Sequence, residues 1–219
     1  MTTSGGQARF PPRVESQLDG WTLVWADLEP VDGHDEAFGE LFERETALLA
    51  DSWRGRQLVD DVTVAALRGL FRDAGCDPTR YRPSSEALLR RLRRDGVPRT
   101  PFPVVDLNNL LSLRLRAPCC VVDASTVRPP LVFRRGAEGE SMDSMRGPMR
   151  LEGRPVLADG LGPFGTPISD AERVRVRAGT RRVWMVVYLP EGAASSEEIR
   201  ADLDRLLKGA PVARLLAVA

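Results

Sequence analysis

Residues 104–113 read Val-Val-Asp-Leu-Asn-Asn-Leu-Leu-Ser-Leu, a run that places two carboxamides and a carboxylate among aliphatic side chains. These apolar neighbours indicate that the polar groups are at least partly buried. A buried amide needs hydrogen-bond partners, because leaving it without any costs stability. The partners are either backbone groups of a neighbouring loop or atoms of a bound ligand, and the run by itself leaves both open.

Apolar residues that recur every three or four positions predict a helix-rich first half of the chain and one helix near its end. The predicted helices cover 35–50, 62–74, 84–95, 106–115 and 196–208. In the third of them, Ser84 is expected to cap the start and Gly96 to end the helix. Asp106 is expected to cap the fourth.

Short apolar runs separated by Gly and Pro predict a strand-rich second half. The predicted strands cover 21–28, 119–122, 131–134, 155–158, 174–177 and 183–189. Helices followed by strands favour an α+β fold. We expect residues 1–13, rich in Gly, Ser and Pro, to form a disordered tail and residues 14–219 to form a single domain.

Composition and charge restrict the class of protein. The chain has 219 residues, 42% of them hydrophobic, and its 31 basic residues balance 31 acidic ones. No apolar stretch approaches a membrane span, and a neutral chain is poorly suited to gripping long nucleic acid, so neither a membrane nor a DNA partner is expected. Three cysteines without a Cys-x-x-Cys pair suit a cytoplasmic protein with no disulfide framework, metal or other cofactor.

Three stretches of the chain carry a family pattern. Residues 105–109 read Val-Asp-Leu-Asn-Asn, and Pro118, Cys120 and Asp123 follow at set distances. Together they are similar to the motif VDxxNYxxLxxGxPxHxxD in the editing domain of the phenylalanyl-tRNA synthetase beta subunit, the B3/B4 domain. Residues 81–91 and 162–170 resemble segments of free-standing proteins of this type. The resemblance spans residues 80–190 and implies helices packed on a β-sandwich-like, three-layer core.

The resemblance implies a free-standing editing protein, which hydrolyses the ester joining a wrong amino acid to the 3′ end of a tRNA. Such an ester is already activated, so backbone amides and a carboxamide could orient the carbonyl and one water. The family has its pocket asparagine at Asn109, the candidate catalytic and substrate-binding residue, whose alternative role is to brace a loop. Asn108 is expected to point elsewhere. If nothing is hydrolysed, the protein would instead be a binding module for a free amino acid or small metabolite.

Two positions depart from the family. Cys120 stands where the family has histidine, and Met185 or Val186 stands where the family has the glutamate that reads a tyrosine hydroxyl. A thiol is a weak hydrogen-bonding group, so any role of that histidine is lost or changed, and selection of tyrosine by that contact is in doubt. A nucleophilic dyad would require His34, the single histidine, to reach Cys120, and we do not favour it.

Residues 160–165 spell G-x-G-x-x-G, but Pro163 removes a backbone donor that a phosphate cradle needs. We expect a loop that approaches the pocket, with Phe164 as an apolar wall; the alternative is an ordinary surface turn with a buried Phe164. Asp170 and Arg173 either hold this loop through a charge-assisted bond or recognise the amino acid. The predicted substrate-binding residues are Asn109, Cys120, Phe164, Gly165, Asp170 and Arg173.

Arginines cluster over residues 80–99. The candidates for contact with tRNA phosphates near the acceptor end are Arg82, Arg90, Arg91 and Arg94. Their alternative role is a solvated helix face, on which Glu86 pairs with Arg90 four residues later.

Overall fold

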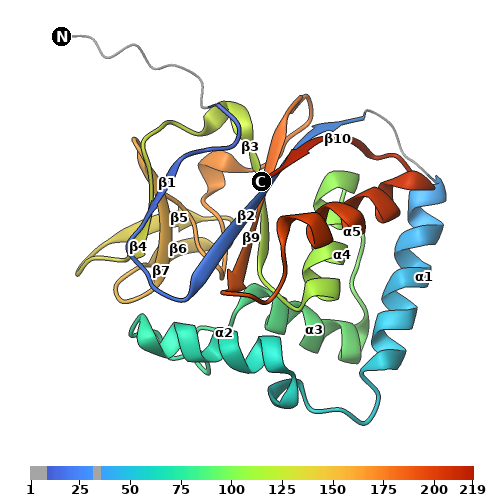
Figure 1. Ribbon diagram of the computed structural model, residues 1–219, viewed down its shortest axis with the longest axis horizontal. Coiled ribbons are helices and arrows are strands. Elements are labelled where there is room, and N and C mark those ends of the chain that lie inside the picture. Colours follow the sequence, from blue (N-terminus) through green and yellow to red (C-terminus); the bar gives the residue numbers. More distant parts are fainter. Residues whose placement is uncertain (1–8, 32–35) are drawn as a thin grey trace.

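The computed structural model describes residues 9–31 and 36–219 and arranges them in three layers (Figure 1). The central sheet has the strand order β10-β2-β9-β3, and all its neighbours are antiparallel. Its strands are β2 (Trp21–Pro30), β3 (Cys119–Asp123), β9 (Val183–Pro190) and β10 (Ala213–Val218).

A second layer, the outer sheet, has the order β1-β4-β7-β8. Its strands are β1 (Val14–Ser16), β4 (Leu131–Arg135), β7 (Pro155–Asp159) and β8 (Gly162–Gly165). A separate hairpin consists of β5 (Ser141–Ser144) and β6 (Gly147–Arg150).

The third layer is helical. The helices are α1 (Glu36–Ser52), α2 (Val62–Asp73), α3 (Ser84–Asp95), α4 (Pro103–Leu115) and α5 (Ser196–Lys208). Helices α1, α4 and α5 lie on the face of the central sheet opposite the outer sheet, and α2 and α3 lie below it in the view of Figure 1. Three short 3-10 turns complete the chain: Leu58–Asp60, Ala124–Thr126 and Glu172–Val174.

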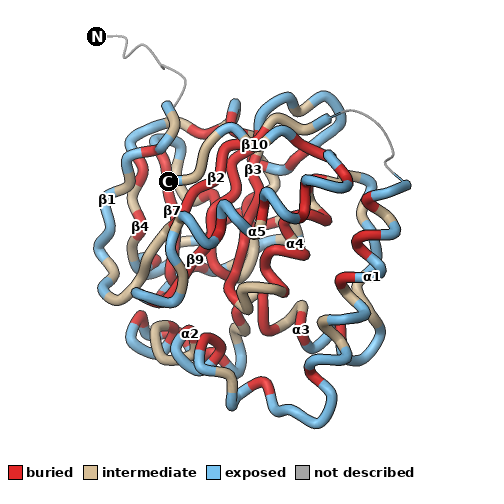
Figure 2. Tube along the Cα trace, turned by 45° about the vertical axis from the view of Figure 1, so that its right-hand side comes forward, coloured by how far each residue is buried: buried red, intermediate tan, exposed pale blue. Residues whose placement is uncertain are grey.

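Strand β9 is buried along its whole length (Figure 2). Trp184 and Tyr188 point into the apolar core between the two sheets, whereas Met185 and Val187 point into the core beneath the helices. Successive side chains of a strand alternate between its faces, so one strand supplies both cores. A strand buried on both faces appears in the sequence as a continuous apolar run, which residues 183–189 are.

The predicted three-layer α+β architecture is confirmed, and so are the five helices. Two details at helix starts are wrong. The N-cap of α3 is Pro83, and Ser84 makes no capping hydrogen bond. Helix α4 begins three residues early, at Pro103, a residue that suits the first helical turn. Asp106 therefore lies inside the helix and instead accepts hydrogen bonds from the loop before it, from Thr100 N at 2.8 Å.

Five of the six predicted strands are confirmed, and the strand at 174–177 is wrong. That segment alternates buried and exposed side chains, but it follows a 3-10 turn as an irregular loop that pairs with no strand among the described residues. Sequence reasoning missed β1, β5, β6, β8 and β10. Most of these are three or four residues long or rich in Gly and Pro. Asp35, in the first predicted helix, and His34 lie outside the described residues.

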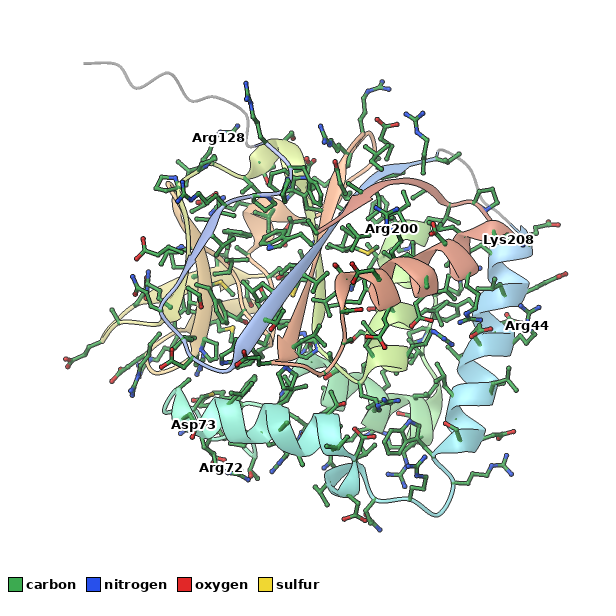
Figure 3. All side chains as sticks on the ribbon, in the orientation of Figure 1. Arg44, Arg72, Asp73, Arg128, Arg200 and Lys208 are labelled. Atoms are coloured by element: carbon green, nitrogen blue, oxygen red, sulfur yellow. The ribbon has the colours of Figure 1, made fainter. Side chains whose placement is uncertain are left out.

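Exposed and buried charged side chains have different surroundings in this protein. Exposed charged side chains such as Arg44, Asp73 and Arg200 project into solvent from different helices (Figure 3). Most buried carboxylates instead form ion pairs with arginine. Glu86, 1% exposed, accepts from Arg68 at 2.9 Å and from Arg90 at 2.9 Å. Because Arg68 belongs to α2 and Glu86 to α3, this carboxylate joins two helices.

We expect Glu86→Gln to lower the free energy of unfolding by about 2–3 kcal/mol, because it leaves the guanidinium groups around it without their counter-charge. Denaturant unfolding monitored by circular dichroism measures the change. The control is Glu40→Gln on the exposed side of α1, for which a change within about 0.5 kcal/mol is expected. Equal effects of the two substitutions would contradict this role.

Candidate functional site

A cavity of about 740 Å³ lies at the free edge of β3. Its walls come from six segments of the chain: the start of α3, the loop before α4 with the first turns of that helix, strand β3, the turn at 145–146, the turn at 168–170 and the loop at 175–178. Strand β3 is the last strand of the central sheet, so no further strand covers this edge. The layers of the fold therefore enclose a space that one more strand would otherwise occupy.

Asn108 and Asn109 both line the cavity, and they are the only asparagines in the chain. The Nδ2 group of Asn108 donates to the carbonyl oxygen of Cys119 at 3.1 Å. This bond orients the amide, so the acceptor Oδ1 faces away from Cys119. Although Asn108 is only 6% exposed, Oδ1 has no hydrogen-bond partner among the described residues. The expectation that Asn108 points away from the pocket is wrong, because Asn108 lines the cavity together with Asn109.

The backbone of β3 offers further polar groups on this side. Tyr188 N donates to Pro118 O at 2.9 Å, and the register then pairs Cys120 with Val186. In an antiparallel ladder, alternate residues direct both backbone groups to the partner strand and the residues between them direct theirs away. Cys119 and Val121 are the residues whose backbone groups point away from β9. The hydrogen bond from Asn108 to Cys119 O fits this geometry. The backbone groups of Val121 accordingly face the open edge, and Val121 lines the cavity.

The turn over residues 166–170 is built around Thr166. Its Oγ1 accepts from Ser169 N at 2.9 Å and donates to Ser169 O at 2.9 Å. The backbone of Asp170 is held on both sides, since Asp170 O accepts from Met145 N at 3.0 Å and the next residue, Ala171, donates to Phe164 O at 2.8 Å. The turn is therefore rigid, and it places Ser169 and Asp170 in the wall of the cavity.

Asp170 is 9% exposed, and its Oδ1 has no hydrogen-bond partner within the part of the chain that the structure describes. Burial raises the pKa of this carboxyl to about 7. A hydrogen bond from the Cys120 thiol lowers this pKa and so partly offsets the effect of burial. The same thiol donates to Thr166 O at 3.5 Å. A carboxyl with a pKa near 7 exchanges its proton at the pH of the cell.

Cys120 and Tyr188 lie beside Asp170. Burial raises the pKa of both groups well above their usual values, and the carboxyl of Asp170 adds to both shifts. Both therefore stay protonated and neutral. Gly165 makes room for this arrangement, because a Cβ there would lie 3.1 Å from the Tyr188 hydroxyl oxygen and 3.3 Å from Asp170 Oδ1.

Of the six predicted substrate-binding residues, the structure brings Asn109, Cys120 and Asp170 to the cavity wall. Phe164 lies behind the lining, fully buried in the core between the sheets. Arg173 is directed elsewhere and donates to Asp159 Oδ1 at 2.7 Å. Through this ion pair and a hydrogen bond to Gly162 O at 3.0 Å, Arg173 holds the loop, which is one of the two roles expected for it. Asp170 forms no ion pair with a described residue.

The positions where the family glutamate was expected are also outside the lining. Met185 belongs to the core beneath the helices and Val186 to the core between the sheets. The segment 160–165 forms the β7–β8 hairpin, in which Asp159 Oδ1 accepts from Leu161 N at 2.9 Å.

Three arginines that the sequence reasoning missed line the mouth: Arg146, Arg175 and Arg177. All three are exposed. Arg175 and Arg177 share one carboxylate, Glu172, at 3.3 Å and 3.0 Å. Arg146 forms no ion pair with any described residue. The sequence did not mark them as a shared site, because Arg175 and Arg177 fall in the segment expected to be a strand, so only the fold brings the three together.

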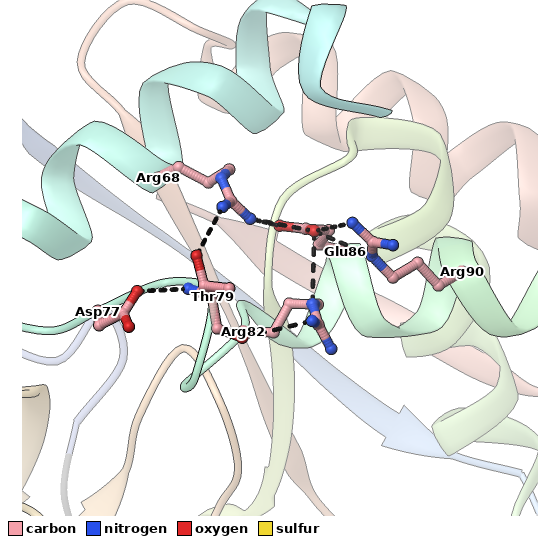
Figure 4. Close-up of polar contacts among 6 residues, drawn as sticks. All are labelled: Arg68, Asp77, Thr79, Arg82, Glu86 and Arg90. Carbon is pink, nitrogen blue, oxygen red and sulfur yellow. Dashed lines mark hydrogen bonds and ion pairs between the residues drawn. The ribbon is translucent and has the colours of Figure 1, made fainter. Parts of the chain in front are cut away.

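The arginines predicted to contact tRNA lie on and before α3. Figure 4 shows two of them, Arg82 and Arg90. Arg82 and Arg90 both surround Glu86, at 3.5 Å and 2.9 Å. Arg94 pairs with the exposed Asp95 at 2.6 Å, and Arg91 is exposed without an ion pair to the described residues. Their contact with tRNA stays a prediction.

Two kinds of feature are absent from the described residues. No group of three His, Cys, Asp or Glu side chains within 9–31 and 36–219 is placed to hold a metal ion. None of the helices in that part of the chain has the length and apolar character needed to cross a bilayer.

A family model described as the B3/4 domain matches residues 67–205, more than half of the chain. The chain belongs to the B3/4 domain family. The matched region includes every wall of the cavity. The expected family is therefore confirmed, and the cavity is a feature of this B3/4 domain.

Among solved structures, this B3/4 chain is similar to an N-terminal fragment of the phenylalanyl-tRNA synthetase beta subunit from Pyrococcus horikoshii. The identity is 13% and the TM-score 0.47, over 97% of this chain and 52% of that fragment. The chain thus spans about half the length of the fragment. No curated protein matches the chain.

We expect Asp170→Asn to stabilise the unliganded protein, and increasingly so as the pH rises from about 4 to about 7. The unfolded carboxyl ionises near 3.8 and the folded one near 7, so between these values ionisation favours the unfolded state. Above pH 7 the gain levels off at up to about 4 kcal/mol.

Denaturant unfolding at pH 4, 6 and 8 measures this difference. The control is Asp143→Asn, at an exposed position of β5. A difference between Asp170→Asn and the original protein that stayed constant over this range would contradict the raised pKa.

Proposed function

We propose that this protein is a trans-editing aminoacyl-tRNA deacylase, which binds the acceptor end of a mischarged tRNA and hydrolyses its aminoacyl ester. The observation that carries the proposal is the cavity at the edge of β3, where Asn108 Oδ1 and the backbone of Val121 have no hydrogen-bond partner among the described residues. Membership of the B3/4 domain family supports it.

The chemistry of an ester suits these groups. The ester carbonyl accepts hydrogen bonds, and the backbone N–H of Val121 is a donor at a fixed place on the sheet edge. Donors that are held in position before the reaction stabilise the charge that develops on the carbonyl oxygen. Asn109 both donates and accepts, so it can orient an attacking water. In this scheme no side chain attacks the ester, which fits the protonated state of Cys120.

The size and charge of the cavity suit an aminoacyl group on a nucleotide. Its volume of about 740 Å³ is within the range of small-molecule sites. The arginines at the mouth, Arg146, Arg175 and Arg177, are placed to meet phosphates of the acceptor end. We retain Arg82, Arg90, Arg91 and Arg94 as candidates for a wider contact with the tRNA. Such a protein would act in the cytoplasm, where its three free cysteines stay reduced.

A non-catalytic binding module is the second candidate. The observation that favours it is the pair of thiols at the cavity, Cys119 and Cys120, one of which stands where the family has histidine. Burial raises the pKa of both thiols, so neither supplies a nucleophile or a base near neutral pH. On this alternative the cavity holds a free amino acid or a small metabolite without turnover.

We expect the protein to release amino acid from at least one member of a panel of mischarged tRNAs. Asn109→Ala should lower kcat/KM by about 10²-fold or more, because it removes a group that orients the reacting water. Asn108→Ala should lower it as well, since the amide positions the β3 edge and faces the cavity. The measurement is release of radiolabelled amino acid from each tRNA.

The matched control is Gln57→Ala, which removes an exposed carboxamide that makes no capping bond. Hydrolysis that is equally fast in Asn109→Ala and the original protein would refute the catalytic role of the amide. If no tRNA is hydrolysed but an amino acid raises Tm, the binding module is the correct alternative.

A further inference from the structure

Buried carboxylates in this protein follow a rule with one exception. Six acidic residues are buried among the described parts of the chain: Asp27, Glu45, Glu86, Asp106, Asp159 and Asp170. The first five each form an ion pair with at least one arginine: Arg182, Arg114, Arg68, Arg99 and Arg173, respectively. Asp170 forms none. It is also the only one of the six that lines the cavity.

The exception is costly for the folded protein. An isolated charge buried away from water is strongly unfavourable unless a counter-charge or hydrogen bonds compensate for it. Yet the backbone holds Asp170 in this position. Asp170 O accepts from Met145 N, and the next residue, Ala171, donates to Phe164 O. The side chain is therefore held against the cavity without the partner that every comparable group has.

No described residue forms an ion pair with Asp170, and Arg146, which lines the same cavity, is exposed. The groups around the carboxyl are Cys120 from β3 and Tyr188 from β9, and both are neutral. Arg173, three residues along the chain, is bound to Asp159. The arginines of the cavity are exposed at its mouth, and two of them already share Glu172.

We propose that Asp170 receives a primary ammonium group of the ligand, which acts as the counter-charge that this carboxylate lacks. The inference rests on the proposed function to the extent that the ligand enters this cavity; it does not require hydrolysis. It assigns an orientation as well: the amine lies at the turn 168–170, and the ester carbonyl lies toward Asn108, Asn109 and the edge of β3.

Two positions on a ligand carry a primary ammonium: the α-amino group that all aminoacyl esters share, and a side-chain amine such as that of lysine. The chemistry at Asp170 is the same for both. In the first case Asp170 recognises the aminoacyl group in general, and in the second it determines which amino acid is accepted. Blocking one amine at a time separates them.

The test uses non-hydrolysable analogues in which an amide joins the amino acid to 3′-amino-3′-deoxyadenosine. The panel carries alanine, serine, phenylalanine or lysine, each with the α-amine free or acetylated, and lysine also with the side-chain amine acetylated. Isothermal titration calorimetry gives the affinities for the full chain and for Asp170→Asn, Asp170→Ala and the control Asp143→Asn.

The expected result is that acetylation of the recognised amine weakens binding at least tenfold in the original protein and in Asp143→Asn. In Asp170→Asn and Asp170→Ala the free and acetylated ligands should bind within about twofold of each other. The original protein should also bind the free amine more tightly as the pH rises from 6 to 7, because the carboxyl ionises in this range while an α-amine with a pKa of about 8 stays mostly charged. Both Asp170 variants should lose this dependence.

The inference is overturned if the Asp170 variants keep the preference for the free amine, or if no analogue binds at any pH. These outcomes are distinct from failure of the proposed function. Deacylation with an unchanged amine preference in Asp170→Asn would refute the ammonium site and retain the deacylase. Amine-dependent binding through Asp170 without turnover on any tRNA would retain the site and refute the deacylase.

Discussion

The burial of β9 on both faces is the constraint on which the rest of the structure depends. Its alternating side chains belong to two apolar cores, so the outer sheet must cover one face and the helices the other. With β2 on one side of β9, only the short strand β3 lies on the other side, and there the central sheet ends. Beyond that edge, the first turns of α4 and the turns and loop at 145–146, 168–170 and 175–178 surround the cavity. The site therefore lies where the central sheet ends, one strand beyond β9.

The parts of this fold that could be predicted are those with a strong local pattern. The helix at 196–208 has a Ser195–Glu198 capping box and the expected ends, and 183–189 is apolar throughout. The prediction failed at 174–177, where alternating Val and Arg suggest a strand. There the arginines serve the rim of the cavity and no neighbouring strand pairs with the backbone. Asp106 shows a related failure, because an acidic residue near a helix start looks like a cap whether it caps or anchors the preceding loop through Thr100.

The candidate site was predictable only in part, for a physical reason. Asn109, Cys120 and Asp170 stand in motifs, and the fold gathers them at one wall. Whether each of these polar groups has a partner in the protein depends on residues elsewhere in the sequence. The free Oδ1 of Asn108 depends on the carbonyl of Cys119, eleven residues away, which holds the other end of the amide. The unpaired state of Asp170 depends on Arg173 being bound to Asp159, a choice that neighbouring positions in the sequence leave open.

Gly165 has a consequence for how such a pocket could change. Its Cα faces the Tyr188 hydroxyl and the Asp170 carboxyl, and a single methyl group there would be in tight contact with both. Since Tyr188 is fixed in the buried strand β9 and hydrogen bonds hold the backbone of the turn, the group that yields would be the Asp170 carboxyl. Its displacement toward the cavity would make the cavity shallower. A substitution of Gly165 alone would thus change the depth of the cavity, while every residue that contacts the ligand stays the same. Selectivity for larger or smaller guests would then differ between proteins whose contact residues are the same.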